Sequence, residues 1–116
     1  MEEFKPFTIE RPWGSFRQLT HNETTTVKII FVKSGQALSL QYHRYRKEFW
    51  RIISGHPLVT VGEDTKSVNP GDDFIIEKLQ PHQLEAPSDD VQVLEIAYGN
   101  FDEEDIVRTK DKYGRA

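Results

Sequence analysis

Cysteine, long apolar runs and an excess of basic residues are all absent from the 116 residues of this chain. Without cysteine the chain has no disulfide and no thiolate ligand for a metal. Every apolar run falls far short of the roughly 20 residues that a membrane helix needs, so we expect no contact with a membrane. Fifteen basic residues against nineteen acidic ones give a formal net charge of -4. That charge gives no electrostatic reason to expect nucleic acid as a partner.

The N-terminal residues MEEFKPF are acidic and lack the apolar segment of a secretory signal, so we expect a cytoplasmic protein. Residues 1–116 suffice for one domain with one core. Hydrophobic residues make up 36% of the chain and aromatic residues 11%, which is typical of a folded soluble protein rather than a disordered one.

Short runs rich in β-branched and aromatic residues alternate along the chain with Gly, Pro, Asn and Asp. Such runs, separated by turn residues, predict an antiparallel sandwich or barrel. We expect strands over residues 27–32, 38–43, 49–54, 57–61, 73–77, 82–86 and 91–99. A single short helix is expected at the C-terminal end, with Asp102 as its N-cap and its end before Gly114. The sequence therefore predicts an all-β fold with one short helix.

Polar residues alternate in the segment SLQYH, where Gln41 and His43 lie two residues apart. On a strand these two side chains share a face with Ser39. If this strand forms a hairpin with the next one, Glu48 converges on the same point. An amide, an imidazole and a carboxylate suit zinc, manganese, iron, cobalt or nickel, and His82 is the candidate for a fourth ligand.

A histidine on a strand is also compatible with a simple hydrogen-bonding role, and the three residues alone leave that alternative open. We interpret the two remaining histidines, His21 and His56, as surface residues because turn residues flank them.

The spacing of these residues resembles the two sequence motifs of the cupin superfamily. Seven positions carry the resemblance: Gly35, Gln41, His43, Glu48 and Gly55 for the first motif, and Gly71 and His82 for the second. The chain departs from the pattern at residues 77–79, which read Glu-Lys-Leu where the motif usually has Pro-x-Gly. The resemblance implies a double-stranded β-helix, or jelly roll, with a divalent metal inside the barrel.

A more specific resemblance covers nearly the whole chain. The segments RPWG, LSLQYH, RKEFW and GNFDEEDIVRTKDKYGR resemble, in this order, the cupin domain of type II mannose-6-phosphate isomerases. That domain is often fused to a mannose-1-phosphate guanylyltransferase, and we expect no nucleotide-sugar synthesis from these 116 residues. Phe49 stands where the family usually has His, which puts activity in question if that His takes part in the chemistry. The RPWG segment is expected to pack on the barrel with Trp13 at least partly buried.

The resemblance implies interconversion of mannose 6-phosphate and fructose 6-phosphate through an enediolate. Its implied metal ligands are Gln41, His43, Glu48 and His82, with zinc preferred and manganese, cobalt, nickel and iron as alternatives. The implied site residues are divided between catalysis, assigned to Arg115 and Lys28, and substrate binding, assigned to Arg46, Arg108 and Tyr113. Lys28, Glu85 and Glu95 are the candidates for the base that moves the proton.

Two further functions stay open: a non-catalytic cupin that binds a sugar or sugar phosphate, and another small-molecule cupin enzyme such as an oxygenase. Gln41 disfavours the oxygenase, because such enzymes generally have His at that position. The expected partner is a small-molecule sugar phosphate, and a homodimer through exposed sheet edges is the expected assembly. The C-terminal segment is expected to fold over the open end of the barrel.

Overall fold

The computed structural model describes residues 5–110 and residue 114, and over these residues the chain consists of strands, turns and loops without a helix. The strands are β1 (Phe7–Arg11), β2 (Gly14–Gln18), β3 (Thr25–Val32), β4 (Leu40–Tyr42), β5 (Lys47–Ser54), β6 (Leu58–Val61), β7 (Asp64–Ser67), β8 (Asp73–Ile76), β9 (His82–Glu85), β10 (Val91–Tyr98) and β11 (Val107–Lys110).

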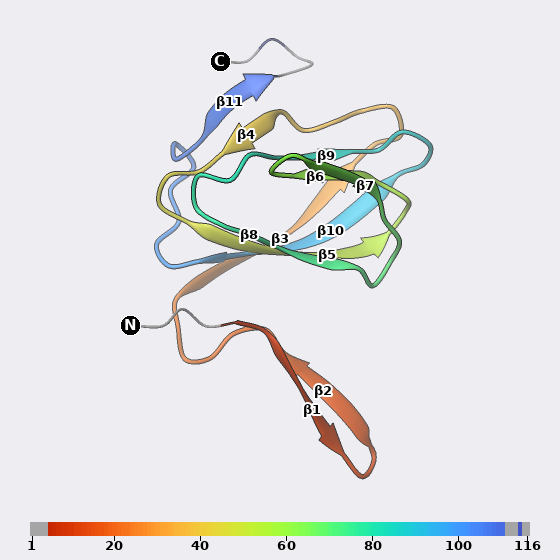
Figure 1. Cartoon of the computed structure of the whole chain (residues 1–116), viewed down its shortest axis with the longest axis vertical. Coiled ribbons are helices and arrows are strands. Elements are labelled where there is room, and N and C mark those ends of the chain that lie inside the picture. Colours follow the sequence, from red (N-terminus) through yellow and green to blue (C-terminus); the bar gives the residue numbers. More distant parts are fainter. Residues whose placement is uncertain (1–4, 111–113, 115–116) are drawn as a thin grey trace.

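Two antiparallel sheets face each other and enclose the core (Figure 1). The first, which we call the lower sheet, has the strand order β3-β10-β5-β8, and the second, the upper sheet, has the order β11-β4-β9-β6-β7. The prediction of an all-β jelly roll is therefore confirmed. The described residues contain no helix that could cross a membrane.

Alternation along the strands decides which side chains enter the core. On β5, Trp50 and Ile52 are 1% exposed and belong to the core cluster, together with Leu84 of β9 and Val93 of β10. Because successive side chains of a strand point to opposite faces, Glu48 shares the inner face of β5 with Trp50 and Ile52. A carboxylate on this face is enclosed between the sheets, and Glu48 is indeed 0% exposed.

The expected C-terminal helix is wrong for the described residues. Asp102 does organise a turn, because its Oδ1 accepts the Glu104 N–H at 2.9 Å. After this turn Val107–Lys110 forms β11, which pairs with β4. Two β-branched residues, Val107 and Thr109, and the free edge of a neighbouring strand favour strand over helix here. The helix prediction rested on local charges, and local charges do not reveal that the edge of β4 is available for pairing.

The N-terminal segment also departs from expectation. Strands β1 and β2 form a hairpin that extends away from the two sheets (Figure 1). Trp13 occupies the turn of this hairpin and is 73% exposed, so the expected burial of Trp13 is wrong. The pattern RPWG forms the tip of a long hairpin, and a tip lies too far from the barrel to pack against its wall.

Candidate metal centre

Three ligand-bearing side chains converge between the two sheets. His43 follows β4, Glu48 lies on β5 and His82 begins β9. Their candidate ligand atoms all lie within 4.8 Å of one another, and each residue is at most 2% exposed. The convergence that the sequence predicted is present, but not through a β4–β5 hairpin. These two strands belong to different sheets, so the ligands meet because the sheets face each other.

Backbone carbonyls fix the orientation of both imidazoles. His43 Nδ1 lies 2.6 Å from the Asp105 carbonyl oxygen, and His82 Nδ1 lies 2.9 Å from that of Gln80. A carbonyl accepts a hydrogen bond, so each Nδ1 carries the proton and each Nε2 presents a lone pair. Burial lowers the pKa of both imidazoles below the usual 6.5. Histidine binds metals as a neutral imidazole, usually with its other ring nitrogen donating a hydrogen bond as it does here.

One of the two Nε2 atoms has a lone pair that accepts no hydrogen bond. His82 Nε2 is buried and has no hydrogen-bond partner among the described residues. A buried polar atom without a partner costs stability and calls for an explanation. A divalent cation supplies that explanation, because two imidazole nitrogens and a carboxylate are a frequent donor set for zinc and related metals. The residues therefore fit the metal that the sequence implied.

Glu48 is held by donors on both of its oxygens. Trp50 Nε1 donates to Oε1 at 3.1 Å, and Arg46 Nε donates to Oε2 at 2.7 Å. Burial opposes ionisation of Glu48, but a hydrogen bond with Glu95 and the nearby imidazoles and guanidinium hold its pKa below the usual value. Glu48 is therefore a carboxylate, the form that binds a cation.

Glu95 lies next to Glu48 on the inner face of β10 and is 5% exposed. Burial, the hydrogen bond with Glu48 and the charge of Glu48 raise the pKa of Glu95 to about 8. Two carboxyl groups this close share one proton, and here Glu95 holds it. Lys28 is its cross-strand neighbour on β3. Of the three predicted candidates for the base, Glu95 directly contacts a candidate ligand.

Arg46 lies inside the site rather than at its rim. Besides its bond to Glu48, one amino group lies 3.3 Å from His43 Nε2 and the other donates to the Asp102 carbonyl at 3.1 Å. The guanidinium also lies over the ring of Phe101, 4.5 Å from its centroid. A neutral imidazole nitrogen has one lone pair. His43 Nε2 therefore accepts from Arg46 or binds a metal, but not both.

Gln41 lies directly opposite His82 in the pairing of β4 with β9. Residues directly opposite in an antiparallel pair point to the same side of the sheet, so Gln41 and His82 share a face. The amide oxygen of Gln41 accepts a hydrogen bond from the Ser39 hydroxyl at 2.8 Å. Gln41 stays a predicted ligand, and its oxygen retains a second acceptor position.

The predicted substrate and catalytic residues are only partly brought together. Arg108 lies opposite Gln41 on β11, and Lys28 Nζ lies 3.3 Å from Glu103 and over the ring of Phe101. Tyr113 and Arg115 lie outside the described residues. The roles assigned to these residues stay predictions.

Two contributors to the site were missed in the sequence. Asp105 supports His43 through its carbonyl, and its carboxylate accepts the backbone N–H groups of Arg44 and Tyr45. Phe101 packs against both Arg46 and Lys28. A helix with Asp102 as its N-cap would include Asp105, so the helix prediction gave no reason to expect that the Asp105 carboxylate holds the β4–β5 turn.

Phe49, the residue that departs from the usual family pattern, points away from the metal centre. It lies between Glu48 and Trp50 in sequence and therefore on the outer face of β5. Its cross-strand neighbours are Ile96 and Ile75, and it is 0% exposed. The substitution at this position therefore changes the packing outside the lower sheet and leaves the ligand set intact.

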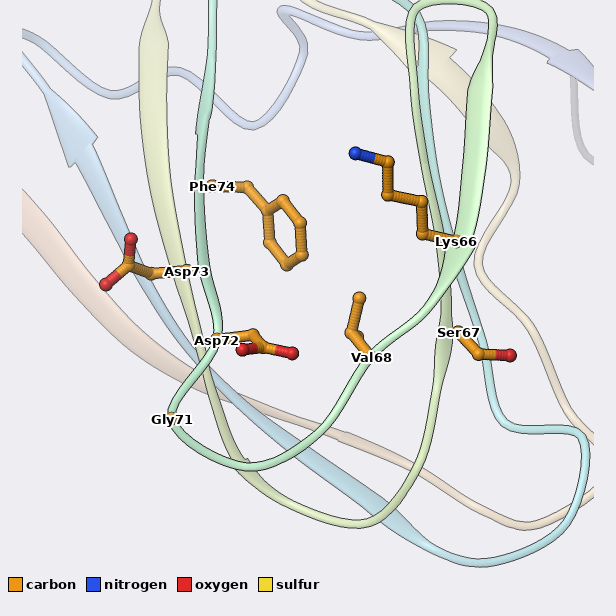
Figure 2. Close-up of a pocket in the computed structure, with 7 residues that line it drawn as sticks. All are labelled: Lys66, Ser67, Val68, Gly71, Asp72, Asp73 and Phe74. Atoms are coloured by element: carbon orange, nitrogen blue, oxygen red, sulfur yellow. The ribbon is translucent and has the colours of Figure 1, made fainter.

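An open cleft of about 470 Å³ lies elsewhere, between the edge strands β7 and β8 (Figure 2). Lys66, Val68 and Phe74 extend across it, while Asp73 points away. His43, Glu48 and His82 are not among the described residues that line this cleft. We therefore place the candidate chemistry between the sheets and not in this cleft.

Comparisons with known proteins agree with this architecture. Residues 2–111 match the family described as Mannose-6-phosphate isomerase C-terminal. A protein named mannose-1-phosphate guanylyltransferase 2, from Escherichia coli O157:H7, is 37% identical over 107 residues, which cover 90% of this chain and 22% of that protein. The chain thus spans less than a quarter of this curated relative's length.

Solved structures share the two-sheet barrel. Oxalate decarboxylase from Bacillus subtilis superposes with a TM-score of 0.68 at 22% identity, covering 75% of this chain and 24% of that one. A putative sugar phosphate isomerase from Acidithiobacillus ferrooxidans gives a TM-score of 0.59 at 19% identity, covering 66% of this chain and 51% of that one. At these identities the likeness concerns the fold alone.

Proposed function

The chain belongs to the mannose-6-phosphate isomerase C-terminal family and has the cupin fold, and on that premise we propose that it is a metal-dependent sugar-phosphate isomerase. The proposed reaction interconverts mannose 6-phosphate and fructose 6-phosphate. The observation that carries the proposal is the buried set of His43, Glu48 and His82, in which His82 Nε2 has no other partner among the described residues.

Gln41, His43, Glu48 and His82 would hold the metal, with zinc as the preferred ion and manganese, cobalt, nickel or iron as alternatives. When bound, a divalent ion polarises the substrate carbonyl and stabilises the negative charge that develops during proton transfer between C1 and C2. The carbonyls of Asp105 and Gln80 hold the two Nδ1 atoms, which would leave both Nε2 atoms available as ligands.

Glu95 is the residue we propose for the proton transfer. Its side chain lies on the inner face of β10 beside Glu48, and its raised pKa of about 8 lets it hold and release a proton near neutrality. Lys28, the neighbour across the strands, is placed to stabilise the ionised form of Glu95. Glu85 is disfavoured, because it alternates with His82 and Leu84 and so lies on the outer face of β9.

The phosphate group requires cationic donors, and the planar fork of arginine suits it best. Arg108 lies on the same side of the upper sheet as Gln41. Arg46 becomes available for a substrate oxygen once it leaves His43 Nε2, because its guanidinium then has an unused N–H group. Tyr113 and Arg115 complete this proposal from the sequence.

A second candidate function is a sugar-phosphate-binding domain without catalysis. It is favoured by the lengths and names of the relatives: this chain matches less than a quarter of a protein named a guanylyltransferase. A domain of this kind would supply or hold substrate for a neighbouring nucleotidyltransferase.

A coupled assay with mannose 6-phosphate, run with chelated protein and with added divalent metals, tests the proposal. We expect turnover that requires metal and is lost in the His82→Ala variant, which should also retain less metal by elemental analysis. The matched control is His56→Ala. His56 is an exposed histidine that is hydrogen-bonded to Asp89, and it does not belong to the candidate metal centre.

The outcomes separate the two candidates. Metal-dependent binding of mannose 6-phosphate in calorimetry without turnover would support the binding domain instead. A folded wild type that retains no divalent metal and binds no sugar phosphate would overturn both.

A further inference from the structure

The loop between β10 and β11, residues 99–106, which we call the strap, passes beside the candidate metal centre. The Asp102 carbonyl accepts an N–H of Arg46 at 3.1 Å, and the ring centroid of Phe101 lies 4.5 Å from the same guanidinium. Arg46 is 7% exposed, so these two contacts anchor the strap on a buried residue. The contact that Glu103 makes differs from them, because it lies at the surface.

Glu103 pairs with Lys28, whose side chain extends from the inner face of β3. Lys28 Nζ lies 3.3 Å from Glu103 Oε1, and the two side chains are 35% and 80% exposed. An ion pair this exposed contributes little to stability. Among the described residues Glu103 is the one anion within ion-pair distance of Lys28. Lys28 therefore holds a carboxylate that another anion can replace at low cost.

Lys28 and Arg46 are neutralised in different ways. Both cations lie over the ring of Phe101, with Lys28 Nζ 4.1 Å and Arg46 Cζ 4.5 Å from its centroid. The charge of Arg46 is matched by the buried carboxylate of Glu48 at 2.7 Å. The charge of Lys28 is matched only by the surface carboxylate of Glu103. If Glu103 moves away, the centre keeps one cation that requires an anion from solution.

We propose that Lys28 is a further phosphate-binding residue of this centre, and that Glu103 occupies the phosphate position until the substrate displaces it. A phosphate monoester carries about -1.5 to -2 charges at pH 7 and three acceptor oxygens. It therefore competes well with a single carboxylate for an ammonium group, to which lysine brings a point charge. The phosphate end of the sugar lies under the strap at Lys28, while its carbonyl end faces the candidate ligands.

This inference rests on the proposed function for the identity of the sugar, but the exchange of carboxylate for phosphate requires neither a metal nor turnover. The competing explanation is that the pair of Lys28 with Glu103 is a structural tie that fixes the strap. The two explanations predict opposite effects of removing the Glu103 charge, because a tie favours binding when it is present and a competitor favours binding when it is absent.

Titration of inorganic phosphate into metal-free protein, followed by NMR, tests the exchange without any binding to a metal ion. Glu103→Gln should bind phosphate about two- to fivefold more tightly, which is what loss of an exposed ion pair of up to about 1 kcal/mol yields. Lys28→Met should bind it at least about tenfold more weakly, because a charge-assisted bond is lost. Glu104→Gln is the matched control: Glu104 is exposed, its hydrogen bond to Asp102 is made by its backbone N–H, and its change should leave the affinity as it is.

A double variant separates competition from a general change in charge. Lys28→Met combined with Glu103→Gln should bind phosphate no more tightly than Lys28→Met alone, because the competitor has lost its partner. With metal present, Glu103→Gln should bind mannose 6-phosphate more tightly and mannose as the wild type does. Near-ultraviolet circular dichroism verifies that the variants are folded.

Weaker phosphate binding by Glu103→Gln would overturn the proposal in favour of the structural tie. Equal binding by the wild type, Glu103→Gln and Lys28→Met would overturn it as well. If the phosphate exchange is observed but mannose 6-phosphate is never turned over, the proposed isomerase function fails and Lys28 remains an anion site. If turnover is observed and neither substitution changes the affinity for phosphate, the isomerase stands and this inference fails.

Discussion

Replacing Arg46 by methionine should weaken the metal-free protein and strengthen its hold on a metal. Arg46 is 7% exposed, its Nε donates to Glu48 at 2.7 Å, and its amino group lies 3.3 Å from His43 Nε2. Breaking a buried ion pair from one side costs about 3–5 kcal/mol, because the remaining charge has lost its partner. The metal-free Arg46→Met variant should lose stability in that range.

The effect on metal affinity follows from the single lone pair of His43 Nε2. A metal must displace one hydrogen bond from a charged donor, worth about 1.5–3 kcal/mol. Since 1.4 kcal/mol corresponds to a tenfold change in an equilibrium constant, the variant should bind zinc or cobalt about 10- to 100-fold more tightly than the wild type. The thermal stabilisation caused by adding metal should increase accordingly.

Calorimetric titration of metal into chelated protein measures this directly, and the absorption spectrum of bound cobalt reports on its coordination. Lys28→Met is the control, because it removes another inward-facing positive charge that does not contact His43. Arg46→Lys is a second comparison: it keeps the positive charge, but its single amino group replaces the separate nitrogen atoms with which Arg46 contacts Glu48 and His43. If Arg46→Met binds metal no more tightly than the wild type, or if Lys28→Met shows the same gain, the competition between Arg46 and metal is refuted.

Three further predictions concern single positions. Phe49→His should lower the free energy of unfolding by about 2–4 kcal/mol, since it buries a polar ring in an apolar site, yet leave metal affinity within about threefold because the side chain points away from Glu48; calorimetry and denaturant unfolding check both, and a large loss of metal binding would contradict the placement of Phe49. Glu95→Gln should increase the stability of the metal-free protein, relative to the wild type, more at about pH 9 than at about pH 5. The native pKa of Glu95 of about 8 lies above the usual 4.5, so the stability that Glu95 contributes to the wild type is full below pH 4.5 and is lost as the pH rises through 8. Unfolding measured across this pH range checks it, and parallel profiles of the two proteins would count against it. Leu79→Gly should stabilise the protein by up to about 1 kcal/mol, because Leu79 has a φ of 66° that a β-branched or bulky residue adopts at a cost; chemical denaturation measures it, and a less stable variant would rule out strain at this turn.

Much of the fold followed from the sequence, for local reasons. The period-two pattern in the segments 49–54 and 91–99 predicted β5 and β10 to within two residues at either end. The strand predictions depend on alternation, which a single strand carries in its own sequence. The side chains of His43, Glu48 and His82 do converge, and their role as ligands stays a prediction.

The failures concern properties that depend on distant parts of the chain. β11 forms because the edge of β4 is available, and the charges of residues 102–106 carry no information on that edge. The exposure of Trp13 depends on how far β1 and β2 extend beyond the barrel. Arg46 is held in the interior partly by the carbonyl of Asp102, 56 residues further along the chain, so a local sequence pattern assigns Arg46 to the substrate just as readily as to the interior.

The position of β10 in the lower sheet has a consequence for synthesis on the ribosome. β10 pairs with both β3 and β5, which do not pair with each other. It is also the last strand of that sheet in chain order. β5 can pair with β8 before that point, but β3 and the other edge of β5 have no partner in this sheet until residues 91–98 have left the exit tunnel. A nascent chain stalled before residue 91 should engage holding chaperones and aggregate readily, whereas one extended past residue 98 should close the lower sheet in one cooperative step.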